Sequence, residues 1–142
     1  MMELLIMPLR IATLHVPHVK TYAIRIFSEF GLDHLTSMQK SDNWVSIERY
    51  VFDDVWPGMP GGLYPRDVVF SEDIASRIID DFMKRKDISE ALLVHCSRGK
   101  NRSPAVAMAL NEIFCLGHDT EELKKQYPDA NWYVYETMLR KG

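Results

Sequence analysis

One stretch of the sequence constrains the fold more than any other, because it sets a strand, a loop and a helix in direct succession. The apolar run Ala91–His95 is short and continuous, as in a central strand that is covered on both faces. Seven residues, Cys96–Arg102, follow it, and then comes Ser103-Pro104, a pair typical of a helix N-cap and first helical residue. A buried strand that feeds a helix through a tight loop is typical of α/β domains.

Strand patterns precede this unit and helix patterns follow it. Alternating apolar residues and runs of β-branched and aromatic residues predict strands over Glu3–Met7, Thr21–Phe27 and Trp44–Phe52. Spacing of apolar residues and capping signals predict helices over Glu72–Lys86, with Ser71 as its cap, Pro104–Leu116, with Gly117 as its end, Thr120–Gln126 and Trp132–Arg140. We therefore predict an α/β fold with a central, mostly parallel sheet covered by helices.

The length of 142 residues fits one domain, residues 1–142, with a sizeable core. No stretch of 18 uncharged apolar residues occurs, so we expect no transmembrane helix. The apolar start of the chain contains Glu3, Pro8 and Arg10, and it reads as a core strand rather than a signal peptide. Two cysteines, Cys96 and Cys115, make neither a disulfide framework nor a CxxC pair, which favours a reducing, cytoplasmic location.

The net charge limits the classes of partner. Seventeen Lys and Arg against twenty Asp and Glu leave the chain at about −3, whereas general nucleic-acid binders are more often basic. An anion site in this chain must therefore be a local cluster of donors and cations that acts against the overall charge.

The loop Cys96–Arg102 is suited to be such a site. It ends at the start of a helix, where unpaired N–H groups and the positive end of the helix dipole gather. Gly99 permits the positive φ that lets successive backbone N–H groups point inward. Such a loop fits a tetrahedral phosphate, and it lowers the pKa of a thiol at its base, here Cys96. Arg102 offers a planar fork for two phosphoryl oxygens.

These residues resemble a known signature. The pattern His-Cys-x2-Gly-x2-Arg-Ser/Thr of the cysteine-dependent protein phosphatases, in their small dual-specificity-like branch, is matched at His95, Cys96, Gly99, Arg102 and Ser103. Phe52–Val55 is similar to the general-acid segment of that family. The segment Pro128–Asn131, before the last predicted helix, is similar to its closing Pro-Asn segment, although proline and asparagine are not adjacent here. The resemblance covers about residues 44–140.

The resemblance implies a two-step phosphoryl transfer without metal or other cofactor. It makes Cys96 the nucleophile, Arg102 a ligand of the phosphoryl oxygens and Asp54 the general acid. Ser103 would stabilise the departing thiolate, and His95 would support the loop from beneath. The remaining loop residues would bind the substrate phosphate: Ser97, Arg98, Gly99, Lys100 and Asn101.

Some residues keep two interpretations. Asp53 competes with Asp54 for the role of the acid, and either could instead be a turn residue after a strand. In the larger tyrosine phosphatases an acid follows tryptophan and proline, whereas Gly58 follows Trp56-Pro57 here. Arg98 and Lys100 are either solvated charges or an extension of the anion site. Cys115 is expected in the core. His15 and His18 have HxxH spacing, but no Cys, Asp or Glu nearby completes a metal site.

The sequence thus predicts a phosphatase for phosphotyrosine, and for phosphoserine or phosphothreonine if the pocket is as shallow as the short chain indicates. Two alternatives keep the same chemistry on phosphoinositides or on RNA 5′-triphosphate ends. A sulfurtransferase is disfavoured by the His-Cys start and Ser103-Pro104. An inactive phosphate-binding module is disfavoured because Cys96, Arg102 and an acid are all present.

Overall fold

The computed structural model describes all residues, 1–142, as an α/β fold around one parallel sheet. The strands are β1 (Glu3–Pro8), β2 (Thr21–Phe27), β3 (Trp44–Val51) and β4 (Ala91–Cys96), in the order β1-β4-β2-β3. All three neighbouring pairs are parallel. The predicted α/β class and parallel sheet are confirmed, and each strand matches its predicted range to within one residue.

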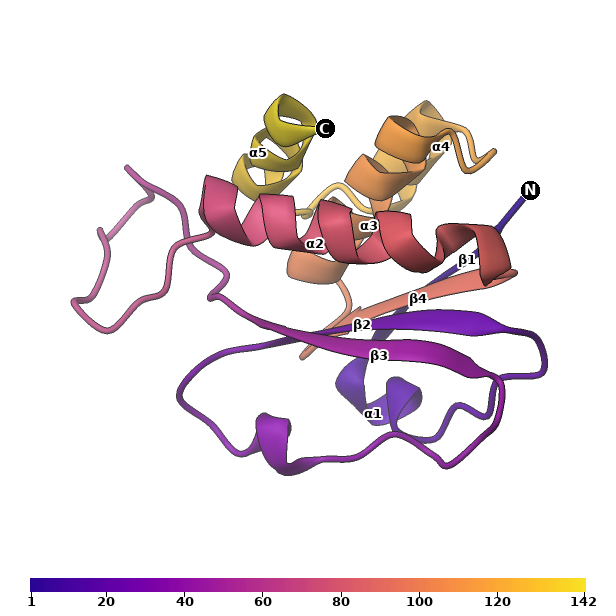
Figure 1. Ribbon diagram of the computed structural model, residues 1–142. Coiled ribbons are helices and arrows are strands. Elements are labelled where there is room, and N and C mark those ends of the chain that lie inside the picture. The colour runs from indigo at the N-terminus through magenta and orange to yellow at the C-terminus, as the bar shows by residue number, and fades with distance from the viewer.

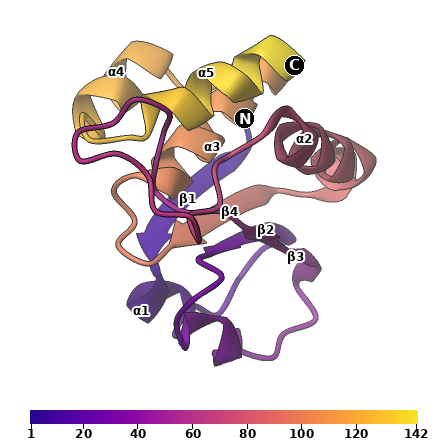
Figure 2. The ribbon, with the colours of Figure 1, turned by 90° about the vertical axis from the view of Figure 1, so that its left-hand side faces the viewer.

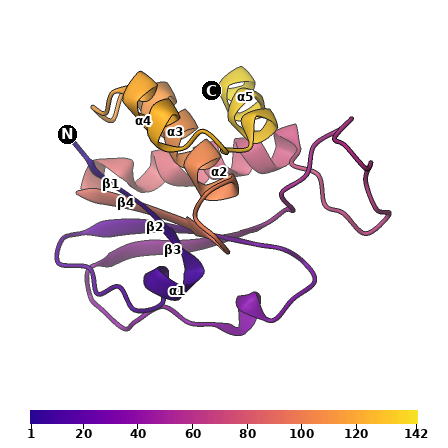
Figure 3. The ribbon, with the colours of Figure 1, turned by 180° about the vertical axis from the view of Figure 1, so that it is seen from behind.

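The two faces of the sheet are covered unequally (Figure 1). On one face lie α2 (Glu72–Arg85), α3 (Arg102–Phe114), α4 (Thr120–Gln126) and α5 (Trp132–Lys141). On the other lie the short helix α1 (Leu9–Ala12) and a long connection with the 3₁₀ turn η1 (Asp33–Leu35). A second 3₁₀ turn, η2 (Lys86–Ile88), joins α2 to β4. The view from behind shows the same two layers (Figure 3). No helix is long and apolar enough to cross a membrane.

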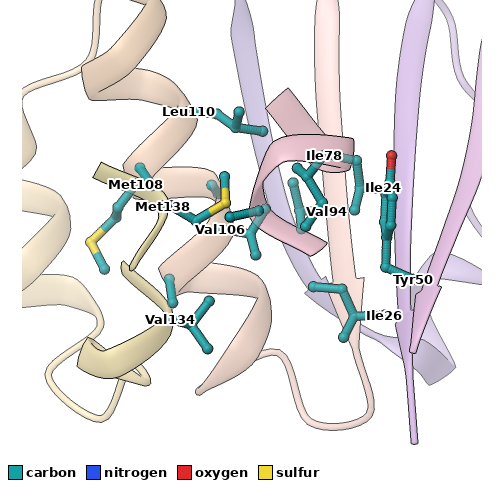
Figure 4. Close-up of a cluster of buried hydrophobic side chains, with 14 of the residues drawn as sticks. Ile24, Ile26, Tyr50, Ile78, Val94, Val106, Met108, Leu110, Val134 and Met138 are labelled. Atoms are coloured by element: carbon teal, nitrogen blue, oxygen red, sulfur yellow. The ribbon is translucent and has the colours of Figure 1, made fainter. Parts of the chain in front are cut away.

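The core lies between the sheet and the four-helix layer. Ile24, Ile26 and Val94 of the sheet face Val106 of α3 and Ile78 of α2 in the same buried cluster (Figure 4). Helix α2 turns one apolar face inward, because its isoleucines and Phe82 recur at helical spacing. Its start is fixed as predicted: the side chain of Ser71 accepts a hydrogen bond from the N–H of Ile74 at 3.2 Å.

Two boundaries of α3 differ from the prediction. The helix begins at Arg102 rather than Pro104, because the hydroxyl of Ser103 contacts Cys96 and does not cap the helix. It ends at Phe114, before Gly117. The backbone turns left-handed at Cys115, with φ of 53°, and the side chain of Asn111 bonds both the N–H and the C=O of His118. Cys115 is therefore exposed, and the expectation of a core residue is wrong.

Because the strands are parallel, their carboxyl ends meet at one edge of the sheet. Figure 2 looks toward this edge, where the long connection between β3 and α2 runs beside the start of α5. Ser28 after β2, Asp53 and Asp54 after β3, and the loop after β4 are all brought to this edge. The candidate site lies there.

Candidate active site

The loop after β4 curls around the thiol of Cys96, which is 2% exposed. The backbone N–H groups of Gly99 and Ser103 point at the Cys96 Sγ, at 3.3 and 3.5 Å. The hydroxyl of Ser103 lies 3.1 Å from the same sulfur. Three hydrogen-bonding groups thus converge on one sulfur atom, as they would on a thiolate.

Gly99 is required by two features of the loop. Its φ is +71°, a left-handed conformation that side chains disfavour. A Cβ there would lie 2.6 Å from the Pro8 nitrogen and 2.7 Å from the Met7 carbonyl carbon, so the loop touches the end of β1 without space for a side chain. The predicted role of Gly99 in shaping the loop agrees with this contact.

The surroundings of Cys96 favour its ionised form. Burial by itself raises the pKa of the thiol, but the hydrogen bonds from the side chain and N–H of Ser103 oppose it. The charge of Arg102 and the N–H of Gly99 act in the same direction, and together they hold the pKa of Cys96 below its ordinary value. A thiolate is the nucleophilic form of cysteine.

Arg102 stands at the first position of α3 and is 7% exposed. Its Nη1 donates to the carbonyl of Phe52 at 2.9 Å and to the hydroxyl of Ser28 at 3.1 Å. Its Nη2 makes one long bond, 3.3 Å, to the hydroxyl of Ser97, and its Nε donates to no protein atom. One end of the guanidinium is therefore anchored, and the other end is left to bind an anion in the loop.

His95 is buried at the end of β4, directly before Cys96, and its side chain has an arginine as its partner. The side chain of Arg25, on the neighbouring strand, donates from Nε to His95 Nε2 at 2.9 Å. Burial, and then the charge of Arg25, lower the pKa of His95 to about 4, so the ring is neutral near pH 7. Since Nε2 accepts, the single ring proton lies on Nδ1.

Arg25 is itself 1% exposed and has no carboxylate partner. Its guanidinium donates to the carbonyl and hydroxyl of Thr36, at 3.0 and 2.9 Å, and it lies 4.8 Å from the centre of the Phe27 ring. Burial, and then the charge of Arg49, lower the pKa of Arg25 to about 10. A buried cation thus lies under the anion loop. The sequence held no signal for it, since Arg25 occupies an ordinary position of a predicted strand.

The two aspartates after β3 have different surroundings. Asp53 pairs with the backbone of Val68 in both directions, because its N–H donates to the carbonyl at 2.8 Å and its carboxylate accepts from the N–H at 2.7 Å. Asp54 instead faces a cavity that it shares with Asn101 and Asn131. Its Oδ1 accepts from the side chain of Asn131 at 2.9 Å, and its Oδ2 has no protein partner. Asp53 is held by a loop backbone, and Asp54 has a carboxyl oxygen free.

Asn131 connects three parts of the site and is 2% exposed. Its N–H donates to the carbonyl of Asn101 in the loop at 2.9 Å. Its side-chain amide donates to Asp54 and to the carbonyl of Val55, and its Oδ1 caps α5 by accepting from the N–H of Val134 at 3.1 Å. The sequence reasoning singled out Asn131 only as part of a Pro-Asn segment, without a role.

Two further residues at the site were missed by sequence reasoning. Asp33, in η1, accepts from the hydroxyl of Ser97 at 3.0 Å, and Ser28 holds Arg102 as described. Both lie on the connection after β2, whose length and composition give no motif. They enter the site only because β2 is a neighbour of β4 in the sheet.

Two charged residues of the loop, Arg98 and Lys100, are exposed and line cavities that Cys96 does not line. The side-chain amide of Asn101 donates to the carbonyl of Asp129 at 2.7 Å, away from the thiol. These three side chains are thus not gathered around Cys96. No group of three or more His, Cys, Asp or Glu side chains is arranged to hold a metal ion.

The comparisons with known proteins give little beyond this geometry. No protein-family model matches the chain, and no curated protein matches it. Among solved structures, the chain is similar to Tk-PTP in its active form, with 17% identity over 87% of this chain and 81% of that chain, and with a TM-score of 0.47. A likeness at this level decides nothing about activity.

Proposed function

We propose that this chain, as a single catalytic domain, is a phosphatase of the cysteine-dependent protein phosphatase type. The observation that carries the proposal is the convergence of the Gly99 N–H, the Ser103 N–H and the Ser103 hydroxyl on the sulfur of Cys96. A buried structural thiol has no need of three such groups, whereas a nucleophilic thiolate does. Arg102, with one end anchored and the other free, supplies the cation that a phosphoryl group needs.

In the first step, the Cys96 thiolate attacks phosphorus. A P–S bond forms and the P–O bond to the leaving group breaks. The backbone N–H groups from Ser97 to Arg102 and the free end of the Arg102 guanidinium bind the equatorial oxygens, where charge develops. Asp54 donates its proton to the leaving oxygen, through the carboxyl oxygen that Asn131 leaves free.

In the second step, water attacks the phosphocysteine and Asp54, now ionised, takes a proton from it. The P–S bond breaks, inorganic phosphate leaves, and the thiolate is restored. The hydroxyl of Ser103, 3.1 Å from the sulfur, stabilises the returning negative charge. His95, neutral and bonded to Arg25, keeps the base of the loop in place throughout.

The proposed substrate class rests on the surroundings of Cys96. None of the three cavities has Cys96 in its lining, which supports a shallow site rather than a deep slot for phosphotyrosine alone. We propose phosphotyrosine in proteins as the substrate, with phosphoserine and phosphothreonine also accessible. A free thiol of this kind functions in a reducing compartment, which supports a cytoplasmic location.

The test is the release of inorganic phosphate from an aryl phosphate, phosphopeptides, phosphoinositides and triphosphorylated RNA. The wild type should hydrolyse the aryl phosphate and the phosphotyrosine peptide, and Cys96→Ser should be inactive on both while it keeps the fold. The inactive-module alternative requires that no substrate be hydrolysed. A preference for phosphoinositides or RNA would keep the chemistry and replace the substrate. A rate of hydrolysis by Cys96→Ser comparable to that of the wild type would show that Cys96 is not the nucleophile.

A further inference from the structure

Three cavities join into one groove that starts at Asp54 and runs along the outside of the phosphate loop. We call it the outer groove. Successive cavities share lining residues: Trp56 and Trp132 line the first and second, and Arg98 and Lys100 line the second and third. The third cavity, about 470 Å³ in volume, also contains Arg10, from the start of α1. The groove therefore connects the proposed general acid to a basic end.

The basic end consists of Arg10, Arg98 and Lys100, all of them exposed. None of the three side chains makes an ion pair or donates a hydrogen bond, whereas the ion pairs of the chain lie elsewhere, on η2 and α4. The one carboxylate in the groove at this end is Asp129. Three unpaired cations around one cavity, in a chain of net charge −3, are a local excess of positive charge that an anionic group can neutralise.

The end nearer Asp54 has a different character. Trp56 and Trp132 are each 37% exposed and stand on the wall of the same cavity as Asp54, with Tyr133 beside them. Exposed tryptophan next to a catalytic carboxyl offers apolar contact area to whatever is attached to the leaving oxygen. From Asp54 outward, the groove thus offers aromatic surface first and cations second.

We propose that the outer groove binds the leaving-group side of the substrate, and that Arg10, Arg98 and Lys100 bind acidic side chains of a phosphopeptide. The inference rests on the proposed function, since the groove is placed on the leaving-group side by the role of Asp54. A peptide is favoured over a nucleic acid or an anionic membrane, because the rest of a chain at −3 repels an extended negative surface but not a short acidic segment. The substrate is then a phosphorylated residue with acidic neighbours.

Arg10 is the position that tests the groove most cleanly. It lies outside the phosphate loop and its side chain has no bonding partner, so Arg10→Ala leaves the catalytic groups undisturbed. The substrates are two phosphotyrosine peptides of equal length, one with glutamates and one with glutamines beside the phosphotyrosine, and an aryl phosphate. Lys84→Ala, an exposed lysine in the last turn of α2, is the matched control for net charge.

Loss of one exposed charge contact should lower kcat/KM for the glutamate peptide by about two- to fivefold at low salt. The kcat/KM for the glutamine peptide and for the aryl phosphate should fall by less. Lys84→Ala should change kcat/KM by less than this for every substrate. The difference should shrink as salt rises, because such charges are screened beyond about 10 Å at 0.1 M. Asp129→Asn should have the opposite sign and raise kcat/KM for the glutamate peptide.

Several results would contradict the proposal that the outer groove binds acidic side chains of the substrate. Equal effects of Arg10→Ala on both peptides, no effect on either at low salt, or a decrease with Asp129→Asn would each do so. If Arg10→Ala lowers kcat/KM only for triphosphorylated RNA or only for phosphoinositides, that ligand and not an acidic peptide occupies the outer groove. If the wild type releases no phosphate at all, the proposed function fails, and the binding of the two peptides to Cys96→Ser then tests the groove separately.

Discussion

The hydrogen bond from Asn131 to Asp54 indicates that Asn131 positions the proposed general acid. A substitution that breaks this bond but keeps the helix cap distinguishes that role from a purely structural one. Asn131 donates to Asp54 Oδ1 at 2.9 Å and to the carbonyl of Val55 at 3.3 Å, and it caps α5 through its Oδ1. We choose Asn131→Ser, since serine caps a helix about as well as asparagine but is too short to reach Asp54. The perturbation removes two hydrogen bonds and keeps the cap.

The expected magnitudes follow from those contacts. Loss of one bond to a neutral carbonyl and one to a carboxylate costs about 2–4 kcal/mol of stability. If Asp54 loses its orientation, kcat for an alkyl phosphate falls by about 10–100-fold, because a displacement near 1 Å can cost that much. An activated aryl phosphate needs little protonation, so its hydrolysis should change far less. KM should change little for either substrate.

The assay is a double-mutant cycle with Asp54→Asn, measured as kcat on alkyl and aryl phosphates. If Asn131 acts through Asp54, the second substitution adds no further loss in the Asp54→Asn background. The coupling free energy is then about 1.4–2.8 kcal/mol, which is the 10–100-fold effect converted. Asp119→Ala, which removes the cap of α4 at a residue that lines none of the three cavities, is the stability control and should leave kcat unchanged. Additive losses, or equal losses on both substrates, would refute the positioning role.

The remaining predictions concern the reacting groups themselves. Asp54→Asn should lower kcat with alkyl phosphates by about 10²–10⁴-fold and remove the basic limb of the pH–rate profile. Asp53→Asn should lower only the stability of the fold. If Asp53→Asn lowers kcat and Asp54→Asn does not, Asp53 is the general acid. Arg102→Lys should have severely reduced activity, because an ammonium cannot keep the hydrogen bonds to the Phe52 carbonyl and the Ser28 hydroxyl and also bind two phosphoryl oxygens. Near-normal activity would contradict a two-pronged contact between Arg102 and the phosphoryl group. In a Cys115→Ser background, alkylation of Cys96 should show a midpoint below that of an ordinary thiol. Burial raises the pKa of this thiol, but the hydrogen bonds from Ser103, the charge of Arg102 and the N–H of Gly99 together lower it by more. Ser103→Ala should raise that midpoint, and an unchanged midpoint would show that the hydroxyl does not stabilise the thiolate.

Much of the fold follows from local patterns in the sequence. The apolar run at 91–95 and the helical spacing with its Ser71 cap predict β4 and α2 almost to the residue, because a buried strand and an amphipathic helix are determined by their own side chains. Local patterns predict the start of α3 incorrectly, because the hydroxyl of Ser103 can either cap the helix or bond the Cys96 thiol. Its hydroxyl bonds the thiol instead of capping the helix, so the helix starts earlier.

The loop that contains the proposed nucleophile could be predicted from a local pattern, because all its groups lie within eight residues, 96–103. The contacts that support this loop could not be predicted in this way. Asn131 and Asp54 are 77 residues apart, and Arg25 and His95 are 70 apart. Both pairs depend on the strand order β1-β4-β2-β3 and on where α5 packs, and no pattern within one segment contains that information. The choice between Asp53 and Asp54 likewise needed the partner of each carboxylate.

The most direct test of the account is to look for phosphate on Cys96. Asp54→Asn, which slows the water attack of the second step, is mixed with an activated aryl phosphate, quenched in acid within the first turnovers and analysed by mass spectrometry of its peptides. A phosphocysteine intermediate predicts one phosphoryl group on the peptide that contains Cys96, formed together with a burst of released aryl alcohol. The phosphoryl group should be absent from Cys96→Ser. Steady hydrolysis without any such adduct, or an adduct on another residue, would contradict it.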